Sequence, residues 1–267
     1  MVNDVAIALR QVRAEQRVFW SIPAAVGFGI AFPIMFLIIF GTIFSGSKAC
    51  VDGYLGSSGQ CVGGSTVPYN HFSVPTIAAW GMITTCFANL AIAMTIRRDS
   101  GQLKRLRGTP LPVGAFLAGV VGSTLITGVV AVALTIAIGA LFYGAPLPAT
   151  WLAVVITILF GGAVFCVLGM ALTAIIPNPD AAPPLVNFSY LPLLFVSGFF
   201  YSFNIAWLND VAKAFPFYWF KQALLSAYGI RPTASGWDGE SLLVLLGWGI
   251  AGLLLALRFF RWQPRAG

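Results

Sequence analysis

Six stretches of this sequence are each long and apolar enough to cross a lipid bilayer as a helix. About 20 apolar residues are needed to cross a hydrocarbon layer about 30 Å thick. We expect these helices at Ile22–Phe44, Val74–Ile96, Val113–Tyr143, Trp151–Ile176, Leu185–Phe203 and Leu242–Phe260. Only 9% of the residues are charged, against about 25% in water-soluble domains, so the chain cannot cover a solvated surface. The sequence therefore predicts an all-α membrane protein with six transmembrane helices.

The distribution of Lys and Arg between the expected spans predicts their orientation. Eleven of the fifteen basic residues fall on the side that carries both chain ends, and four fall on the other side. Because basic loops stay on the cytoplasmic side, we expect a multi-pass protein of the plasma membrane with both termini in the cytoplasm. This distribution accounts for the net charge of +7 without a nucleic-acid partner.

Residues 1–21 are predicted to form an amphipathic helix in front of the transmembrane domain, which occupies residues 22–267. At helical spacing, apolar side chains gather on one face and three arginines gather beside it. A helix of this kind lies along the membrane surface with its arginines near lipid phosphates. It either anchors the chain or acts as a lever on the first span, and the sequence leaves both open. The apolar face consists of Val5, Ala8, Leu9, Val12 and Phe19.

Small residues recur at every fourth position of the third span. Gly119, Ser123 and Thr127 belong to this pattern. In a membrane, such spacing lets a neighbouring helix approach closely. We therefore expect helix packing along this stripe and draw no functional conclusion from it.

Two segments on the outer side have unusual compositions. The loop 45–73 is rich in Gly and Ser and contains Cys50 and Cys61. These cysteines are expected to form a disulfide if that side is oxidising, and two free thiols are the alternative. A metal site is not expected, because His71 is the only histidine and no carboxylate cluster accompanies it.

The second unusual outer segment is 204–240, which precedes the last span. It mixes aromatic residues with Asn, Asp, Lys and Pro. It is too polar to span the bilayer and too apolar for a free loop, so we expect re-entrant or interfacial helices there.

The inner connection 97–112 is compact and basic. Leu103 and Leu106 lie three residues apart and would form an apolar ridge on a short helix, which a Gly-Thr-Pro sequence at 108–110 ends. An ordinary positive-inside loop explains the charge but neither the ridge nor the stop. A short helix pressed against a cytoplasmic protein explains both.

Several kinds of chemistry are missing from the sequence. The expected spans contain no Asp, Glu, Lys or His, which argues against a transporter driven by protons or sodium. No phosphate-binding loop of the type GxxxxGK[ST] is present. A membrane enzyme would need a catalytic cluster, and Asp238 and Glu240 are too few and without partners. If the protein moves a substrate uphill, its energy must therefore come from another subunit.

The inner basic segment carries a resemblance to a known family. RDSGQLKRLRGTPL (98–111) is similar to the pattern RExGTLERLRxTPL that follows the second span in membrane subunits of ABC exporters of the second permease type. IIPNPDAAPPLVN (175–187) and FVSGFFY (195–201) resemble the family's turn between spans four and five and its fifth helix. The resemblance covers the whole chain and implies the fold of the G-subfamily transporters. Lys104 stands where the family often has an acid, which suggests a partner with an acidic socket.

The resemblance also implies partners and site residues. Two copies of the chain, or this chain with a homologue, would pair with two nucleotide-binding ATPase subunits, which would hold ATP and Mg²⁺ while this chain binds no cofactor. The residues implied to couple to the ATPase are Arg98, Asp99, Gly101, Leu103, Arg105 and Leu106. The residues implied to line the substrate pathway, on the second and fifth spans, are Thr84, Thr85, Asn89, Asn187, Ser189, Phe195, Ser197 and Phe199.

The function expected from these observations is export. The chain would be the permease subunit of an ATP-driven exporter, without an ATPase activity of its own. A charge-free, aromatic-rich pathway suits a lipophilic or amphipathic cargo such as a drug or a lipid. Two alternatives stay open: export of a glycan-linked lipid by the same machinery, and a scaffold or sensor subunit that transports nothing.

Overall fold

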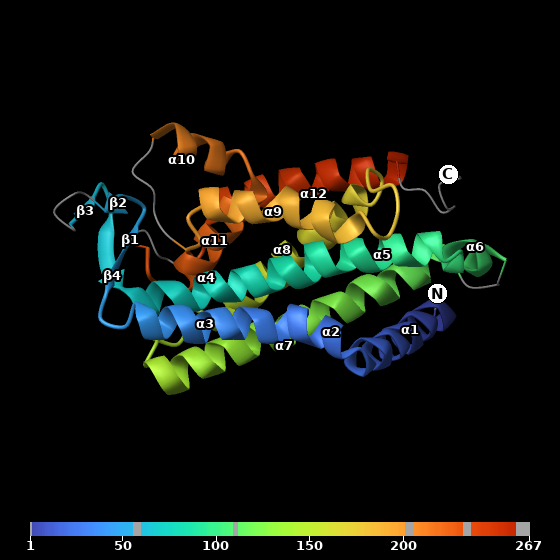
Figure 1. Cartoon of the computed structure of the whole chain (residues 1–267), viewed down its shortest axis with the longest axis horizontal. Helices are drawn as coiled ribbons and strands as arrows, with labels where there is room; N and C mark the ends of the chain where they lie inside the picture. Colours follow the sequence, from blue (N-terminus) through green and yellow to red (C-terminus); the bar gives the residue numbers. More distant parts are fainter. Residues whose placement is uncertain (1, 56–59, 109–111, 201–205, 232–235, 260–267) are drawn as a thin grey trace.

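The computed structural model describes residues 2–55, 60–108, 112–200, 206–231 and 236–259. Most of the helices run roughly along the long axis of an elongated bundle (Figure 1). The helices are α1 (Val2–Ser21), α2 (Pro23–Val26), α3 (Phe32–Ile43), α4 (Tyr69–Ile83), α5 (Leu90–Asp99), α6 (Gln102–Arg107), α7 (Val113–Tyr143), α8 (Trp151–Leu172), α9 (Ala182–Val196), α10 (Ala206–Lys213), α11 (Pro216–Ala227) and α12 (Gly239–Phe259). Two π-helical turns, η1 (Gly27–Ala31) and η2 (Thr84–Asn89), join α2 to α3 and α4 to α5.

Four helical segments among the described residues are long and apolar enough to cross a membrane. They are Tyr69–Asp99, Val113–Tyr143, Trp151–Leu172 and Gly239–Phe259. Two shorter apolar helices, Gly29–Ile43 and Ala182–Val196, lie where the first and fifth spans are expected. The structure thus agrees with a mostly helical membrane protein, and the number of six spans stays a prediction.

Several ends of the helices differ from the sequence prediction. The second apolar helix begins at Tyr69 and not at Val74, because residues 69–73 continue the helix out of the expected loop. The fifth ends at Val196, where Gly198 turns the backbone with a φ of 69°. The fourth ends at Leu172. The expected ends of the fifth span (201–203) and of the sixth (260) lie outside the described residues.

The core of the bundle is built around an aromatic cluster on the first two apolar helices. Phe32 and Phe36 of α3 lie edge-on to Trp80 of α4, with ring centroids 5.5 and 4.8 Å apart. Phe200, just after α9, joins them at 5.2 Å from Trp80. Edge-to-face pairs at these distances are favourable beyond simple burial. The cluster therefore fixes α9 against the α3–α4 pair.

Two small antiparallel sheets cover one end of the bundle. Strand β1 (Lys48–Val51) pairs with β4 (Ser65–Pro68), and β2 (Tyr54–Leu55) pairs with β3 (Cys61–Val62). Gly64 is required where the hairpins meet, because a Cβ there would lie 2.0 Å from the carbonyl oxygen of Val51. The sequence analysis predicted only a loop for 45–73, so these strands are an addition to the predicted fold.

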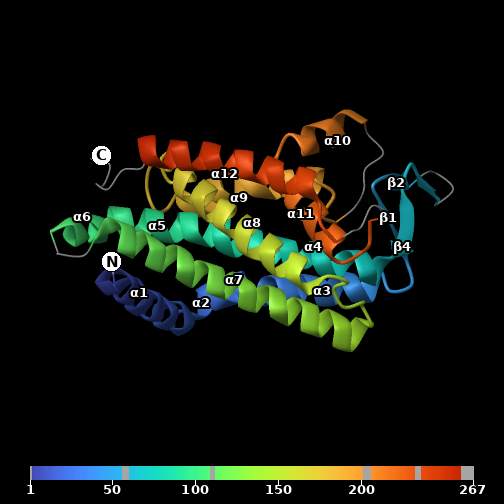
Figure 2. The ribbon, with the colours of Figure 1, turned by 180° about the vertical axis from the view of Figure 1, so that it is seen from behind.

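The two ends of the bundle carry different kinds of structure. We call the end with β1–β4, α10 and α11 the hairpin end, and the end with α6 the elbow end. Figures 1 and 2 both place α6, the N-terminal end of α1 and the C-terminal end of α12 together at the elbow end. The helix pair α10 and α11 lies within the segment 204–240 that was expected to be helical.

Candidate functional site

The basic segment forms a sharp elbow between α5 and α6. Gly101 permits the turn because its φ of 71° is strained for other residues. The nitrogen of Arg105 then bonds to the carbonyl oxygen of Gly101, which starts α6. The side chains of Asp99, Lys104 and Arg105 are exposed. These three charged groups are therefore available to a partner at the elbow end.

Arg98 turns inward from the same elbow and is only 2% exposed. Its Nη1 donates to the carbonyl oxygen of Thr173 at 2.8 Å, and its Nη2 donates to that of Ile176 at 2.8 Å. These carbonyls follow the C-terminus of α8, where helices have unsatisfied acceptors and favour cations. Arg98 thus ties the elbow to the close of α8, a role that the resemblance did not imply.

Leu103 also faces the bundle. It is fully buried in the main hydrophobic core, so it anchors α6 and presents nothing to a partner in this structure. The side chain of Leu106, the other half of the expected ridge, lies outside the described part of the chain, as do residues 109–111 of the motif. Whether the elbow docks on an ATPase stays a prediction for all six implied residues.

A second connection joins the elbow to the N-terminal helix. The guanidinium of Arg97 forms a two-pronged ion pair with the carboxylate of Glu15 in α1. Both side chains are largely buried, so this pair is less exposed to solvent screening than a surface pair. The sequence analysis missed Glu15, because nothing in the sequence places residue 15 beside residue 97.

The helix α1 packs against the small-residue stripe of α7. A Cβ at Gly119 would lie 2.5 Å from Cγ of Gln11, so only glycine allows this approach. Gln16 donates from Nε2 to the hydroxyl oxygens of Ser123 and Thr127 at 3.1 and 3.0 Å. The stripe therefore serves helix packing, as the sequence indicated, and its partner is the N-terminal helix.

These contacts link the elbow to three other helices of the bundle. Arg98 joins it to α8, and the Arg97–Glu15 pair joins it to α1, which is bonded to α7. A displacement of the elbow would therefore be passed to α1, α7 and α8 together.

The residues implied to line a substrate pathway fall into two groups. Four are buried inside this chain: Thr84, Thr85, Ser197 and Phe199. On α9, Asn187 and Phe195 are exposed and Ser189 is half-buried. The eighth residue, Asn89 of η2, is half-buried, and the structure does not bring all eight together. Their role in transport stays a prediction.

Two of the implied pathway residues border a cavity beside the π-helical turns. This cavity of about 130 Å³ lies between α1, η2 and α7 and is bordered by Thr85, Asn89 and Ser123. The hydroxyl of Thr85 donates to the carbonyl oxygen of Gly29 in η1 at 3.4 Å, so the two π-turns lie side by side. Such turns are frequent at functional sites. The two π-turns could not be predicted from the sequence, because they depend on contacts between helices.

A polar network holds the hairpin end together. Arg231 donates from Nε to Asp52 in the β1–β2 turn at 2.9 Å, and it also pairs with Asp238. The carboxylate of Asp238 in turn caps the start of α12, because it accepts hydrogen bonds from the backbone nitrogen and the hydroxyl of Ser241. The sequence analysis treated Asp238 as having no partner, and this was wrong. The network joins the hairpins, the segment after α11 and the last span.

The hairpins also carry the expected cysteine pair. Cys50 of β1 and Cys61 of β3 are joined by a disulfide in the structure. The bond closes a loop that contains Asp52, and so it limits how far the β1–β2 turn can move.

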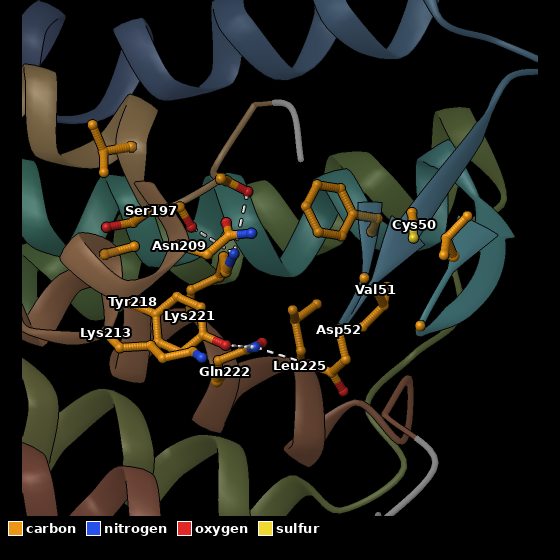
Figure 3. Close-up of a pocket in the computed structure, with 17 residues that line it drawn as sticks. Cys50, Val51, Asp52, Ser197, Asn209, Lys213, Tyr218, Lys221, Gln222 and Leu225 are labelled. Carbon is orange, nitrogen blue, oxygen red and sulfur yellow. Dashed lines mark hydrogen bonds between the residues drawn. The ribbon is translucent and has the colours of Figure 1, made fainter. Parts of the chain in front are cut away.

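A second cavity, of about 250 Å³, lies between the hairpins, α9, α10 and α11 (Figure 3). Lys221 of α11 borders it and is only 7% exposed. Its Nζ donates to the carbonyl oxygens of Ser197 and Gly198 at 2.6 and 3.2 Å, next to the C-terminus of α9. Burial lowers the pKa of the Lys221 ammonium to about 8, although the carboxylate of Asp52 acts in the opposite direction.

The burial of Lys221 was not predicted from the sequence, where Lys221 was counted only as one of the basic residues of a loop. A run of apolar residues on both sides of it, from Phe217 to Leu225, is the signal that could have shown its burial. Tyr218 and Gln222 accompany it on α11, and the amide of Gln222 donates to both Asp52 and Tyr218 at 2.8 Å.

Comparison with known proteins agrees with this architecture. The family described as ABC-2 type transporter matches residues 10–228. The inner membrane transport permease YadH of Escherichia coli (strain K12) is 23% identical over 171 residues, which are 64% of this chain and 61% of the relative. The protein of the same name from Shigella flexneri matches equally. The chain thus spans about three fifths of the length of these relatives.

The matched region contains α1 from Arg10 onward, the elbow, the α8–α9 turn and α11. It therefore covers the elements that carry the resemblance in the sequence and the contacts described above. With its apolar helices, its basic elbow and a family match over most of its length, this chain belongs to the family of ABC-2 type transporters.

Proposed function

We propose that this chain is the membrane permease subunit of an ATP-driven exporter and that a separate ATPase subunit docks on its elbow. Members of this family are membrane components that work with an ATP-binding subunit. The observation that carries the proposal is the construction of the elbow. Exposed charges at its tip are rigidly joined, through Arg98 and the Arg97–Glu15 pair, to three helices of the bundle.

The proposal orients the elbow end toward the cytoplasm and the hairpin end outward. The distribution of basic residues supports this orientation. The disulfide of the hairpin end supports it as well, because disulfides persist in oxidising compartments outside the cytoplasm. The name of the relatives places them in the inner membrane, and we propose the same location for this chain.

The cargo that we propose is lipophilic or amphipathic. Two copies would face each other and enclose a pathway along α9, whose surface exposes Phe188 and Phe195. Aromatic side chains at such a surface bind apolar groups and carry no charge that would repel them. ATP-driven closure of the ATPase pair would shift the elbows and with them the equilibrium between inward and outward access.

The test exchanges the charge at the tip of the elbow. Among the described residues, the side chain of Arg105 donates to the carbonyl oxygen of Ser100, and it is exposed, so we expect Arg105→Glu to leave the bundle intact. The tagged chain is purified from its own membranes, and the co-purified protein with a phosphate-binding loop and the ATP hydrolysis are measured. A negative charge placed against an acidic surface of the partner costs several kcal/mol. We therefore expect the amount of co-purified protein and the rate of ATP hydrolysis each to fall about tenfold or more.

The matched control is Lys48→Glu, the same charge reversal at an exposed position of the hairpin end. This variant should keep its ATPase. Full ATPase activity in the Arg105 variant would contradict the proposal that the ATPase subunit docks on the elbow. If the wild-type chain binds the ATPase subunit but the complex shows no ATP-dependent export, the scaffold or sensor alternative would be favoured.

A further inference from the structure

The cavity at the hairpin end contains a buried cation, the ammonium of Lys221, which among the described residues donates hydrogen bonds to two backbone oxygens. In the described part of the chain, no carboxylate lies within ion-pair distance of Lys221. Its ammonium has three N–H groups, and two of them bond to the carbonyl oxygens of Ser197 and Gly198. A buried charge is costly unless it is paired. The ammonium also lies 5.3 Å from the centroid of the Tyr218 ring, and an anion that accepts its third N–H would supply the opposite charge.

The surrounding acids compensate this cation only in part, through the longer-range attraction of the Asp52 carboxylate. Asp52 borders the same cavity, but its two carboxylate oxygens already accept from Gln222 and Arg231. Asp210 pairs with Lys213 at 3.5 Å and is mostly exposed. The charged residues that line the cavity are Lys221, Lys213 and Asp52, so the wall carries a formal charge of +1, and Lys221 is the buried cation among them.

Two further hydroxyl groups border the cavity. Ser197 is 2% exposed, and its Oγ is buried without a hydrogen-bond partner among the described residues. The hydroxyl oxygen of Tyr218 accepts a hydrogen bond from the amide of Gln222, so the O–H of Tyr218 can itself donate one. Together with Lys221 they offer three donors from two elements (Figure 3). Three donors around one positive charge match the oxygens of a phosphate or carboxylate group.

The size and the opposite wall of the cavity indicate what carries this anion. Its volume of about 250 Å³ is below the roughly 300–1,000 Å³ of pockets that enclose drug-sized ligands. It can therefore hold a headgroup but not a whole amphiphile. Phe72, Val196 and Leu225 also border it, and they provide an apolar surface for the first carbons of an attached chain.

We propose that this cavity binds the anionic phosphate headgroup of an amphipathic molecule, with Lys221, Ser197 and Tyr218 as its donors. As a binding site it stands on the geometry of the hairpin end alone. Its meaning as a station for departing cargo rests on the proposed function.

The test measures binding by the purified chain without any ATPase. The chain in dodecyl maltoside micelles is titrated with dodecyl phosphate, with dodecyltrimethylammonium and with inorganic phosphate, and the midpoint of thermal unfolding is followed by tryptophan fluorescence. We expect dodecyl phosphate to raise the midpoint and the cationic amphiphile not to do so. A free anion as the source would be recognised by an equal effect of inorganic phosphate.

Lys221→Met keeps the length and the packing of the side chain and removes the charge, so the variant should fold. We expect its affinity for dodecyl phosphate to fall about tenfold or more. Ser197→Ala should weaken binding less, and Lys48→Met, at an exposed position of the same end, should leave it unchanged. Equal binding of dodecyl phosphate by the wild type and the Lys221 variant would overturn the proposal, as would an equal effect of the cationic amphiphile.

The result is separable from the proposed function. Loss of binding in the Lys221 variant while ATP-driven export of other cargo continues would support the site. Failure of the elbow test with intact binding would leave the site standing and remove its role in export.

Discussion

Neighbouring basic residues of the elbow have different structural roles. Arg97 pairs with Glu15, Arg98 caps the close of α8, and Arg105 stays exposed. In the sequence these residues form one positive cluster. In the structure, Arg97 and Arg98 attach the elbow to neighbouring helices, whereas Arg105 is exposed and available to a partner.

Arg98 should therefore contribute to stability and Arg105 should not. Arg98→Met leaves the carbonyl oxygens of Thr173 and Ile176 without their donors inside the protein, at a cost of about 1–3 kcal/mol in the free energy of unfolding. Arg105→Met at the exposed tip should change it by less than about 0.5 kcal/mol. Denaturant titrations of the purified variants measure both. Equal stability of the two variants would show that the cap on α8 is unimportant.

The buried ammonium of Lys221 should make stability depend on pH. Burial lowers the pKa of this ammonium to about 8 from the ordinary lysine value of 10.5, so the folded chain loses this proton at lower pH than the unfolded chain does. The free energy of unfolding should therefore rise with pH above about 8. Between pH 7.5 and 9.5 the expected gain is about 2 kcal/mol.

The comparison with Lys221→Met isolates this contribution. The other charged and ionisable groups around Lys221, among them Asp52, Tyr218, Lys213 and Arg231, are present in both proteins, so the two differ by the ammonium of Lys221. Burial raises the pKa of the Tyr228 hydroxyl, so deprotonation of Tyr228 opposes folding only at higher pH. Parallel pH curves for the two proteins would contradict the assignment.

At the scale of elements, close approach between helices is controlled by glycine. A Cβ at Gly169 of α8 would lie 2.7 Å from the carbonyl oxygen of Phe87 in η2, which is backbone and cannot rotate away. Gly247 of α12 has open space around it. The two glycines are alike in the sequence but differ in what they contact.

Alanine at these two glycines should therefore have opposite effects. Gly169→Ala forces α8 away from η2 and should cost about 1–3 kcal/mol. Gly247→Ala should stabilise the helix by about 0.5–1 kcal/mol, because alanine loses less freedom on folding. The midpoint of thermal unfolding in detergent distinguishes them. A stable Gly169 variant would mean that α8 and η2 are not packed as described.

Hydropathy and helical spacing were sufficient to predict most of the helices, the packing stripe of small residues on α7 and the short helix α6, but not that α1 is the partner of this stripe. They could not predict the hairpins, because β2 and β3 have two residues each and depend on pairing across the loop. They also could not predict that Lys221 is buried or that Glu15 meets Arg97, since both follow from contacts between segments distant in the sequence. The π-turns were missed for the same reason.

At the scale of the whole molecule, the two ends of the bundle have separate tasks. The elbow end links exposed charges to α1, α7 and α8, and the hairpin end holds a positively charged cavity beside a disulfide. The helices between them are apolar, and none of the apolar segments between these ends offers an ion-binding cluster in the described residues. In the function that we propose, work enters at the elbow end and cargo leaves at the hairpin end.

The most direct measurement of this claim is flux in liposomes that contain the purified chain, with and without the ATPase that co-purifies with it. The account predicts that a fluorescent anionic amphiphile is moved only when the ATPase and ATP are present, that Arg105→Glu abolishes this flux, and that Lys48→Glu preserves it. Uphill flux driven by a proton or sodium gradient across liposomes that contain this chain alone would contradict the account.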